Sequence, residues 1–594
     1  MEVMVFLLIS LIVHSIPIPY RPGMLRFNRL LKWLPTRLVW GTVAWVLICI
    51  ISQMLLPWAA IGLIMSFAVL MVFSSGFRPE HIEDLMQGVR VPFICFGLII
   101  IIVIPMFSGV IGWTSDVSNA EYFDGMLTKT TEPLFASPIP DNQIRLVTSE
   151  YATYFANQKL ASIGSNIEIA AAHITVKDGR LVWVCVVVST NVLSENYLKA
   201  LIVVDANDPS MYQIITNPEI RTLKAEGLFW DQNIQFGNYL NDMTNSYETA
   251  YPTWDPVGNL VYVQTRTQLG WDFVERPLGP IVYCENGTVI TYPEIQDAPS
   301  WITQAYAEEW LERDVNRWGG YRRGSGFDLF AGGFLWFIAP SNDRLEMTED
   351  TRYILNPDTN RVEALIAVHP PGASALTLSG FIRGTEDNVY YHDLSNAGFA
   401  SGQAATNEII KQFATPTTGS YEAAMPLLYP VQVNATSYRY VWYCPIYWVD
   451  GYYDTDAEQY YISDIRLQAF GMVDAQDVTV SYTLETQGAL TGAALVQAVR
   501  EGYLQEVGGQ IEEEPTSTFQ FNANITSVSS YDQSGNTHIV LGTNNSTYKF
   551  VEGTKSWMNL NDWYTLLNAQ VGDEFNATIQ VVGSEYRIVA FSLI

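Results

Sequence analysis

Acidic, aromatic and histidine side chains are the residues of this 594-residue chain whose types could do chemistry. The segment Asp454-Thr-Asp456-Ala-Glu458 alternates oxygen ligands as a calcium loop does, but it lacks the sharp-turn glycine and the distal bidentate glutamate. No two of the six histidines have the spacing of zinc ligands. They are His14, His81, His173, His369, His392 and His538. We therefore expect no metal and no cofactor, and we interpret the acidic segment as a solvated loop.

Covalent catalysis has no recognisable motif in this sequence, because no G-x-S-x-G nucleophile elbow is present. The segment Gly324–Phe327 follows Arg322-Arg323 and could hold an anion, although a loop after a helix explains it equally well. A carboxyl pair for glycoside hydrolysis stays open, since so many acidic residues make some pair inevitable. We expect a protein that is not an enzyme, with a hydrolase of surface polymers as an alternative.

Aromatic residues gather in the run YVWYCPIYWVDGYYDTD, residues 440–456. The run could form a platform that binds sugars or proteins, but strand aromatics that alternate between core and surface explain it better. Six sequons for N-glycosylation fall at expected turns and strand edges. They are Asn286, Asn434, Asn524, Asn544, Asn545 and Asn576. A glycoprotein with these sites would favour an archaeal source.

The net charge of −29 is unevenly distributed along the chain. Residues 1–113 hold seven of the 32 Lys and Arg and four of the 61 Asp and Glu, which leaves 25 basic and 57 acidic residues for the remainder. That remainder, with a net charge of about −32, should repel nucleic acid and anionic lipid. The five cysteines form no disulfide framework, and we expect them to behave as small buried hydrophobes.

Four apolar stretches within residues 1–113 predict a membrane anchor of four transmembrane helices. They are Met1–Ser15, Leu38–Leu56, Trp58–Phe73 and Pro92–Trp113. The early Glu2 favours a retained first helix over a cleaved signal peptide, and His14 is expected near an interface. The intervening linkers are the basic residues 21–37 and residues 75–90, and positive-inside counting places both in the cytoplasm. The N-terminus and everything after Trp113 would then lie outside.

Downstream, a unit of turn, aromatic strand, connection and second strand begins at Asp178, Gly258, Gly333 and Tyr438. Helical patterns precede some units at Asn142–Leu160, Trp301–Trp318 and Thr406–Phe413. Such units predict small antiparallel sheets backed by helices. We expect modules at 114–297 (a first pair), 298–400 and 401–507.

Residues 516–594 predict five short strands with one helical insert, which indicates a small OB-type barrel. Only Lys549, Lys555 and Arg587 are basic there, so binding of single-stranded nucleic acid is a poor interpretation.

The repeated unit resembles PepSY-type modules. The order IGSNIEIAAAHITVKDGRLVWV, YPTWDPVGNLVYV and APSWITQAYAEEWLERDVNRWG is similar to a group of uncharacterised prokaryotic multi-spanning membrane proteins with a large extracytoplasmic part. The resemblance covers roughly residues 130–480. It implies inhibition, chaperoning or assembly of envelope proteins, and it supplies no catalytic residues.

We therefore predict a membrane-anchored α+β protein with four N-terminal transmembrane helices, tandem antiparallel-sheet/helix (PepSY-like) modules and a C-terminal OB-like β-barrel. It would be a multi-pass protein of the cell membrane whose large C-terminal part is extracytoplasmic. Its expected role is to hold or assemble other envelope proteins or glycans. An extracytoplasmic sensor or regulator is the main alternative. The expected partners are the lipid bilayer, envelope proteins and glycans, without nucleic acid; the oligomeric state stays open.

Overall fold

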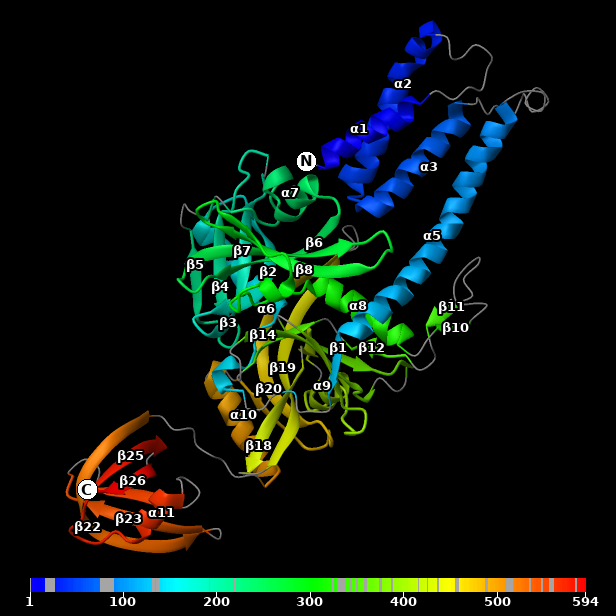
Figure 1. Cartoon of the computed structure of the whole chain (residues 1–594). Helices are drawn as coiled ribbons and strands as arrows, with labels where there is room; N and C mark the ends of the chain where they lie inside the picture. Colours follow the sequence, from blue (N-terminus) through cyan, green and yellow to red (C-terminus); the bar gives the residue numbers. More distant parts are fainter. Residues whose placement is uncertain are drawn as a thin grey trace. The chain divides into compact units, whose positions relative to one another are not determined.

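A computed structural model divides the chain into two compact units, Met1–Gly508 and Gly509–Ile594 (Figure 1). The residues that the structure describes are 2–16, 27–74, 90–130, 134, 139–191, 193–216, 220–221, 223–322, 325–327, 338–340, 344–348, 351–356, 361–372, 376–385, 388–414, 416–424, 426–434, 437–454, 459–486, 490–508, 517–533, 536–545, 549–554, 560–582 and 585–594.

The first unit begins with a bundle of apolar helices. These are α1 (Glu2–Ser15), α2 (Phe27–Trp45) with its π-helical continuation η1 (Val46–Ile51), α3 (Leu56–Ser74) and α5 (Arg90–Met126). Pro57 lies in the first turn of α3, where its missing N–H leaves no helical hydrogen bond unmade. His14 is buried inside the bundle; its Nδ1 donates to Ser10 O at 2.8 Å, and its Nε2 lies 3.1 Å from Ser66 Oγ. The histidine expected near an interface is therefore a packed bundle residue.

The prediction of four transmembrane helices is wrong. Across the described parts of the chain, one helical stretch, Leu34–Ile51, is long and apolar enough to cross a membrane. Helix α1 has 14 residues and rises about 21 Å, which is shorter than a hydrocarbon core of about 30 Å. The other shorter apolar stretches are Leu56–Val72 and Cys95–Ile104. An apolar run alone does not distinguish a helix that crosses lipid from one that packs against neighbouring helices, which is why the count failed.

Helix α5 does not end at Trp113, where the sequence pattern placed its end. It is 37 residues long, reaches Met126 and leads directly into strand β1 (Leu127–Thr130). Strand β1 pairs in parallel with β16 (Val389–Asp393) of a sheet much later in the chain. One continuous element therefore connects the apolar bundle to the sheets.

Strands of the first unit form four large sheets and one small one in a mixed α/β arrangement. The first sheet has the order β2 (Ile167–Lys177), β3 (Arg180–Ser189), β4 (Ala200–Asp205) and β5 (Tyr212–Ile215). The second has the order β6 (Asn245–Trp254), β7 (Leu260–Leu269), β8 (Glu275–Cys284) and β9 (Val289–Thr291).

The third sheet joins β1 and β16 to β15 (Gly380–Gly384), β14 (Arg361–His369) and β12 (Glu346–Met347), with β13 (Arg352–Asn356) also pairing with β14. The fourth contains β17 (Ser420–Ala423), β19 (Ser437–Asp454), β20 (Gln459–Asp474) and β21 (Ser481–Glu485), with β18 (Leu427–Asn434) on β19. Strands β10 (Ser325–Phe327) and β11 (Ile338–Pro340) form a separate pair. The repeat units at Asp178, Gly258 and Tyr438 all fall on strands, and Gly333 lies outside the described residues.

The first unit also contains the helices α6 (Ser149–Ile163), α7 (Ile234–Asn241), α8 (Glu308–Tyr321), α9 (Gly402–Ile410) and α10 (Gly492–Glu506), with short 3-10 turns η3 (Asp141–Gln143), η5 (Trp230–Gln232) and η6 (Ile295–Asp297). Helices α6 and α8 begin later than the sequence pattern indicated and α9 begins earlier, whereas α7 and α10 were not predicted. Helix α6 begins after Thr148, whose Oγ1 accepts from the backbone N–H of Tyr151 at 3.1 Å. A local cap, rather than the apolar period, fixes this start.

Strand β3, RLVWVCVVVS, is buried along nearly its whole length because protein covers both of its faces. Val182, Val184 and Val186 share a core with Tyr262 and Tyr283 of the second sheet. The other face, with Trp183 and Cys185, belongs to the core that includes α6, α8 and the third sheet. The first two sheets therefore share a core on each face, with Thr175 of β2 donating to Thr253 Oγ1 of β6 at 2.8 Å, and their hairpin turns line one groove.

The second unit is a closed five-stranded barrel. Its order is β22 (Ser517–Gln533), β23 (Asn536–Thr543), β24 (Phe550–Thr554), β26 (Glu585–Leu593) and β25 (Glu574–Val582), and α11 (Leu560–Leu567) lies between β24 and β25 in sequence. The rings of Phe521, Phe575 and Phe591 fill the interior, with centroids 5.8 and 5.3 Å apart. A five-stranded barrel with a helical insert is what the sequence indicated for this region.

Trp310 offers a test of the core around α8. Its side chain is fully buried between Phe123, at 5.7 Å, and Tyr306, at 5.6 Å between ring centroids. Because truncation would leave a large cavity, Trp310→Ala should lower the free energy of unfolding by about 3–5 kcal/mol, measured by thermal or denaturant unfolding in detergent. Trp271→Ala is the control, since this ring is 68% exposed. Equal unfolding midpoints for the two variants would contradict the packing described here.

Candidate functional site

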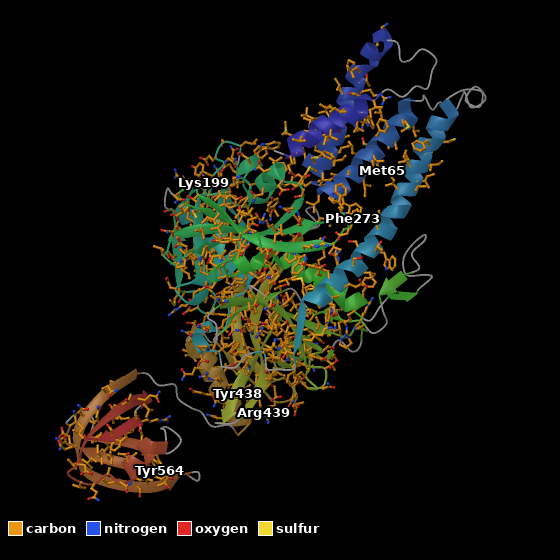
Figure 2. All side chains as sticks on the ribbon, in the orientation of Figure 1. Met65, Lys199, Phe273, Tyr438, Arg439 and Tyr564 are labelled. Atoms are coloured by element: carbon orange, nitrogen blue, oxygen red, sulfur yellow. The ribbon has the colours of Figure 1, made fainter. Side chains whose placement is uncertain are left out.

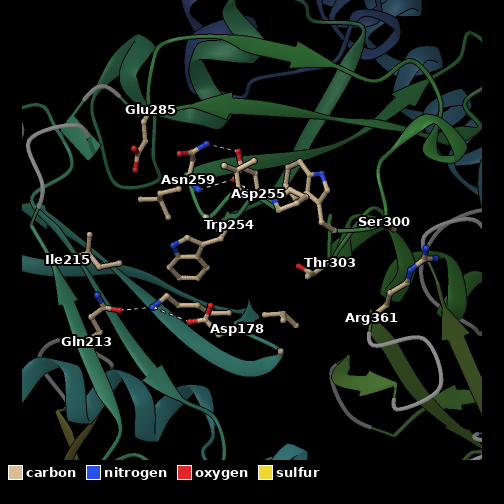
Figure 3. A pocket seen from close by; sticks show the side chains of 18 of the residues that line it. Asp178, Gln213, Ile215, Trp254, Asp255, Asn259, Glu285, Ser300, Thr303 and Arg361 are labelled. Carbon is tan, nitrogen blue, oxygen red and sulfur yellow. Dashed lines mark hydrogen bonds and ion pairs between the residues drawn. The ribbon is translucent and has the colours of Figure 1, made fainter.

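A groove of about 930 Å³ opens between two hairpin turns of the first and second sheets (Figure 3). The β2–β3 turn and strand β5 line one side, and the β6–β7 turn lines the other. The segment before α8 and the first residue of β14 complete the wall. The groove thus collects residues that are more than 180 positions apart in the chain, from Val176 to Arg361.

The β2–β3 turn is a two-residue loop, because Lys177 pairs with Arg180 across the strands. Asp178 and Gly179 both have positive φ angles, 53° and 74°, which is the geometry of a type I′ turn. Asp-Gly is a preferred sequence for this turn, so the local sequence specifies it. The tight turn fixes where Lys177 and Asp178 enter the groove.

The β6–β7 turn is held closed by its first residue, Asp255. Its carboxylate accepts backbone N–H groups of Val257 at 3.0 Å and Asn259 at 2.8 Å, and the Asn259 side-chain amide at 2.9 Å. Burial alone would raise the pKa of Asp255, but these hydrogen bonds lower it below its ordinary value. The carboxylate therefore stays ionised and can accept hydrogen bonds, but it is not suited to donate a proton.

Two tryptophans, Trp254 and Trp301, and several polar side chains line the groove. Trp254 lies at its centre, and the Lys177 ammonium sits 5.4 Å from its ring centroid (Figure 3). The same ammonium donates to Gln213 Oε1 at 2.6 Å and lies 3.8 Å from Asp178. Trp301 belongs to the wall that precedes α8. Flat apolar rings beside amide and carboxylate groups can bind a ligand that has apolar faces and many hydroxyls.

A second depression of about 500 Å³ adjoins the groove around the β2–β3 hairpin. Lys177, Asp178 and Gln213 line both hollows, and the second continues past Arg180 and Tyr212. The recognition surface is therefore elongated, which fits an extended ligand better than a compact one.

A half-buried acidic cluster lies where α8 begins. His173 of β2 forms an ion pair with Glu226, although burial opposes its charged form; Glu226, assisted by Glu308 and Glu309, raises the pKa of His173. Burial, with repulsion from Glu312 and Glu309, raises the pKa of Glu308 to about 7. None of these residues lines the groove.

Two arginines further along α8 bridge carboxylates from other elements. Arg313 pairs with Glu248 of β6 at 2.9 Å and with Glu275 of β8. Arg317 pairs with Asp116 of α5 at 3.0 Å and with Asp314 at 2.7 Å. These pairs fix α8 against the second sheet and α5 at the same time.

The structure separates most of the side chains that the sequence singled out. Among the side chains it describes, no three His, Cys, Asp or Glu residues form a group that could hold a metal. Asp454, the first residue of the candidate calcium loop, is the last residue of β19, and residues 455–458 lie outside the described residues. Arg323 and Gly324 of the candidate anion site also lie outside them. In the aromatic run, Trp442, Tyr443 and Tyr447 are buried, so these rings do not form an exposed platform. No disulfide joins any of the five cysteines, all of which the structure describes.

The sequons occupy different kinds of position. Asn286 is exposed in the β8–β9 turn, and Asn434 ends β18. Asn524 and Asn544 are exposed, with the Asn544 amide 3.4 Å from Asn524 Oδ1. Asn545 and Asn576 are half-buried. Whether any of them carries a glycan stays a prediction.

Sequence reasoning missed the groove, although two signals for it were present. Both hairpin turns contain Asp and Gly, and each directly follows a residue that enters the groove, Lys177 or Trp254. Trp301 and Arg361 could not be assigned from sequence, because only the packing of distant elements brings them there. No protein-family model matches this chain, and no curated protein matches it.

The raised pKa of Glu308 predicts a dependence of stability on pH. Glu308 keeps its proton up to about pH 7 in the folded protein, whereas its ordinary pKa of 4.5 applies in the unfolded chain. Between these two pH values the folded state binds more protons than the unfolded state, so the free energy of unfolding falls as pH rises. The His173 ion pair acts in the same direction, because its stabilisation is lost as pH rises through its raised pKa. Glu308→Gln should gain roughly 2 kcal/mol relative to wild type at pH 8 and little at pH 4.5.

Melting curves of both proteins from pH 4.5 to 8 measure this difference. Glu506→Gln, at an exposed position that ends α10, is the matched control and should follow the wild-type curve. A Glu308→Gln protein that parallels the wild type at every pH would show that this carboxyl is not perturbed.

Proposed function

We propose that this is a membrane-attached binding protein of the cell surface whose groove holds envelope glycans, and that it helps to hold or assemble envelope components. The observation that carries the proposal is the elongated surface around the β2–β3 hairpin, where Trp254 and Trp301 face charged and amide side chains. The expectation that the protein is not an enzyme remains part of this proposal.

The chemistry of the groove favours a polyhydroxylated ligand. The faces of Trp254 and Trp301 can cover the apolar C–H surfaces of a sugar ring. Asp255 accepts hydrogen bonds in its ionised form, and Asn259 and Gln213 offer both donors and acceptors. An open, polar groove of this kind suits a chain that passes through it, because both ends can continue into solvent.

Membrane attachment is supported by the apolar surface of the helical bundle. Large apolar side chains on all four of its helices are more than half exposed. They are Met4, Val5, Leu8, Ile12, Val39, Leu47, Ile51, Ile64, Phe96, Ile99 and Ile102. Lipid around the bundle would cover them, and Leu34–Ile51 is the stretch suited to cross it.

A sensor or regulator is the second candidate, favoured by the continuity of α5. This helix runs without interruption from the bundle to β1 and pairs with α8 through Asp116. A rotation of the sheets would therefore be transmitted through α5 to the helices of the bundle. Gly112→Pro would interrupt α5, and under the sensor function it should abolish the downstream response while groove binding persists; a retained response would exclude this candidate.

The hydrolase alternative is less well supported by the described residues. Burial clearly raises the pKa of three carboxyl groups, those of Glu248, Glu308 and Asp314. For Glu248 and Asp314 it does so although nearby arginines lower the pKa. None of them lines the groove. A general acid for glycoside cleavage would have to reach the bound sugar.

Trp254→Ala tests the proposed function. Loss of the central ring should weaken binding of soluble oligosaccharides released from the envelope of the native source by at least about tenfold, measured by calorimetry on the full-length protein in detergent. Trp271→Ala, which removes an exposed ring at the opposite end of β7, should bind like the wild type. Unchanged affinity of Trp254→Ala, or no binding by any variant, would contradict the proposed groove.

A further inference from the structure

We propose that a second surface of the globular part lies against the lipid headgroups of the membrane that holds the bundle, with a preference for acidic headgroups. This aromatic–basic patch consists of Leu193, Phe229, Trp230, Lys199, Arg221 and Lys224. The inference rests on the membrane attachment proposed above, and it adds a place where the lipid surface meets the domain itself.

A chain of contacting rings connects the patch to the bundle. Phe229 and Trp230 are 47% and 44% exposed, and their ring centroids are 6.2 Å apart. Trp230 contacts Phe236 at 5.2 Å, and Phe236 stacks on Tyr239 at 6.4 Å. The Tyr239 hydroxyl donates to Met54 O at 2.9 Å, in the turn between η1 and α3. The exposed rings are therefore fixed to the bundle through Phe236 and the buried Tyr239.

The backbone holds Trp230 in an uncommon conformation. Its φ is +57°, in the left-handed region that bulky residues rarely adopt. Asn233 caps α7 immediately afterwards by accepting from Phe236 N at 2.9 Å. A strained position that exposes a tryptophan is the kind of feature found at functional surfaces.

A neighbouring loop adds a third apolar side chain to the patch. Leu193 is 78% exposed. The Asn196 side chain fixes the loop to Phe229, donating to its carbonyl at 2.9 Å and accepting from its N–H at 2.7 Å. Leu193 is thereby held on the side of the domain that carries the exposed rings.

Three basic side chains lie in the segments next to these apolar groups, just before β4 and in the stretch that precedes Phe229. Tyr197 lies between Lys199, at 4.2 Å, and Arg221, at 4.9 Å from its ring centroid. Lys199 also pairs with Glu195 at 2.8 Å (Lys199 is labelled in Figure 2). Lys224 lies beside α7, where its Nζ would be 3.1 Å from a Cβ placed at Gly237. Glu195 and Asp231 are exposed in the same segments, so attraction to an anionic surface depends on Arg221, which is exposed, and on Lys224, which is half-buried.

Lipid accounts for this composition better than a protein partner, because aromatic residues also mark the other contact between sheet and bundle. At the β7–β8 turn, Phe273 packs 4.8 Å from Trp58 of α3, and Trp271 next to it is 68% exposed (Figure 2). Ser115 of α5 donates to Phe273 O at 2.7 Å and fixes this turn. Exposed aromatic rings beside apolar helices are typical of the membrane–water interface.

Photo-crosslinking of the full-length protein in nanodiscs tests the patch. The photoreactive amino acid p-benzoyl-phenylalanine replaces Trp230, Leu8 or Val257 in separate variants, in equal amounts of phosphatidylcholine and phosphatidylglycerol. Leu8 lies on the exposed face of the bundle, and Val257 is 85% exposed in the groove turn. Mass spectrometry should find lipid adducts at positions 8 and 230, with a yield at least about tenfold above position 257.

The pattern of adducts separates the two proposals. Adducts at position 8 without adducts at position 230 would overturn the patch and leave membrane attachment intact. Absence of adducts at both positions would overturn membrane attachment and the patch together.

The charge preference has its own readout in the same nanodiscs. The double variant Arg221→Gln, Lys224→Gln should lower the ratio of phosphatidylglycerol to phosphatidylcholine adducts at position 230, by about fivefold for each basic residue that reaches the headgroups. Lys411→Gln, at an exposed position after α9, is the control and should leave the ratio unchanged. An unchanged ratio in the double variant would overturn the preference for acidic headgroups.

Discussion

The packing of helix α8 is the constraint on which the first unit depends. Trp310 and Trp318 are buried, and Arg313 and Arg317 on the adjoining part of the helix surface neutralise carboxylates from the second sheet and from α5. Trp318 Nε1 also donates to Asp124 of α5 at 2.8 Å. Half-buried ion pairs of this kind add little net stability, but their geometry admits few alternative arrangements. Helix α8 thus sets how the sheets meet the long helix that continues into the bundle.

Two surfaces follow from this arrangement. Because the first two sheets meet along β2 and β6 and share a core on each face, their hairpin turns enclose the groove with Trp254 between them. The β7–β8 turn at the opposite end of the same sheet contacts α3 and α5 through Phe273. A single sheet therefore carries the proposed glycan groove at one end and meets the proposed membrane region at the other.

The sequence predicted elements where the signal was local. The unit expected to begin with a turn at Asp178 does so, the apolar run that follows forms strand β3, and the alternating pattern after residue 516 forms a barrel. It failed where tertiary packing decides. Apolar helices in the bundle were counted as spans, although among the described residues only Leu34–Ile51 is long and apolar enough to cross a membrane. The groove was missed because Trp301 and Arg361 join Trp254 only after distant segments pack together, and the acidic total concealed the local basic patch.

Hydrogen exchange of the full-length protein in nanodiscs, with and without oligosaccharides from its own envelope, tests the central claim most directly. The account predicts that sugar slows exchange in the two hairpin turns, around Asp178 and Asn259, and in the segment near Trp301, while the barrel and the bundle are unaffected. Slowed exchange confined to other regions, or no change under conditions where the sugar binds, would contradict the assignment of the groove as the recognition site.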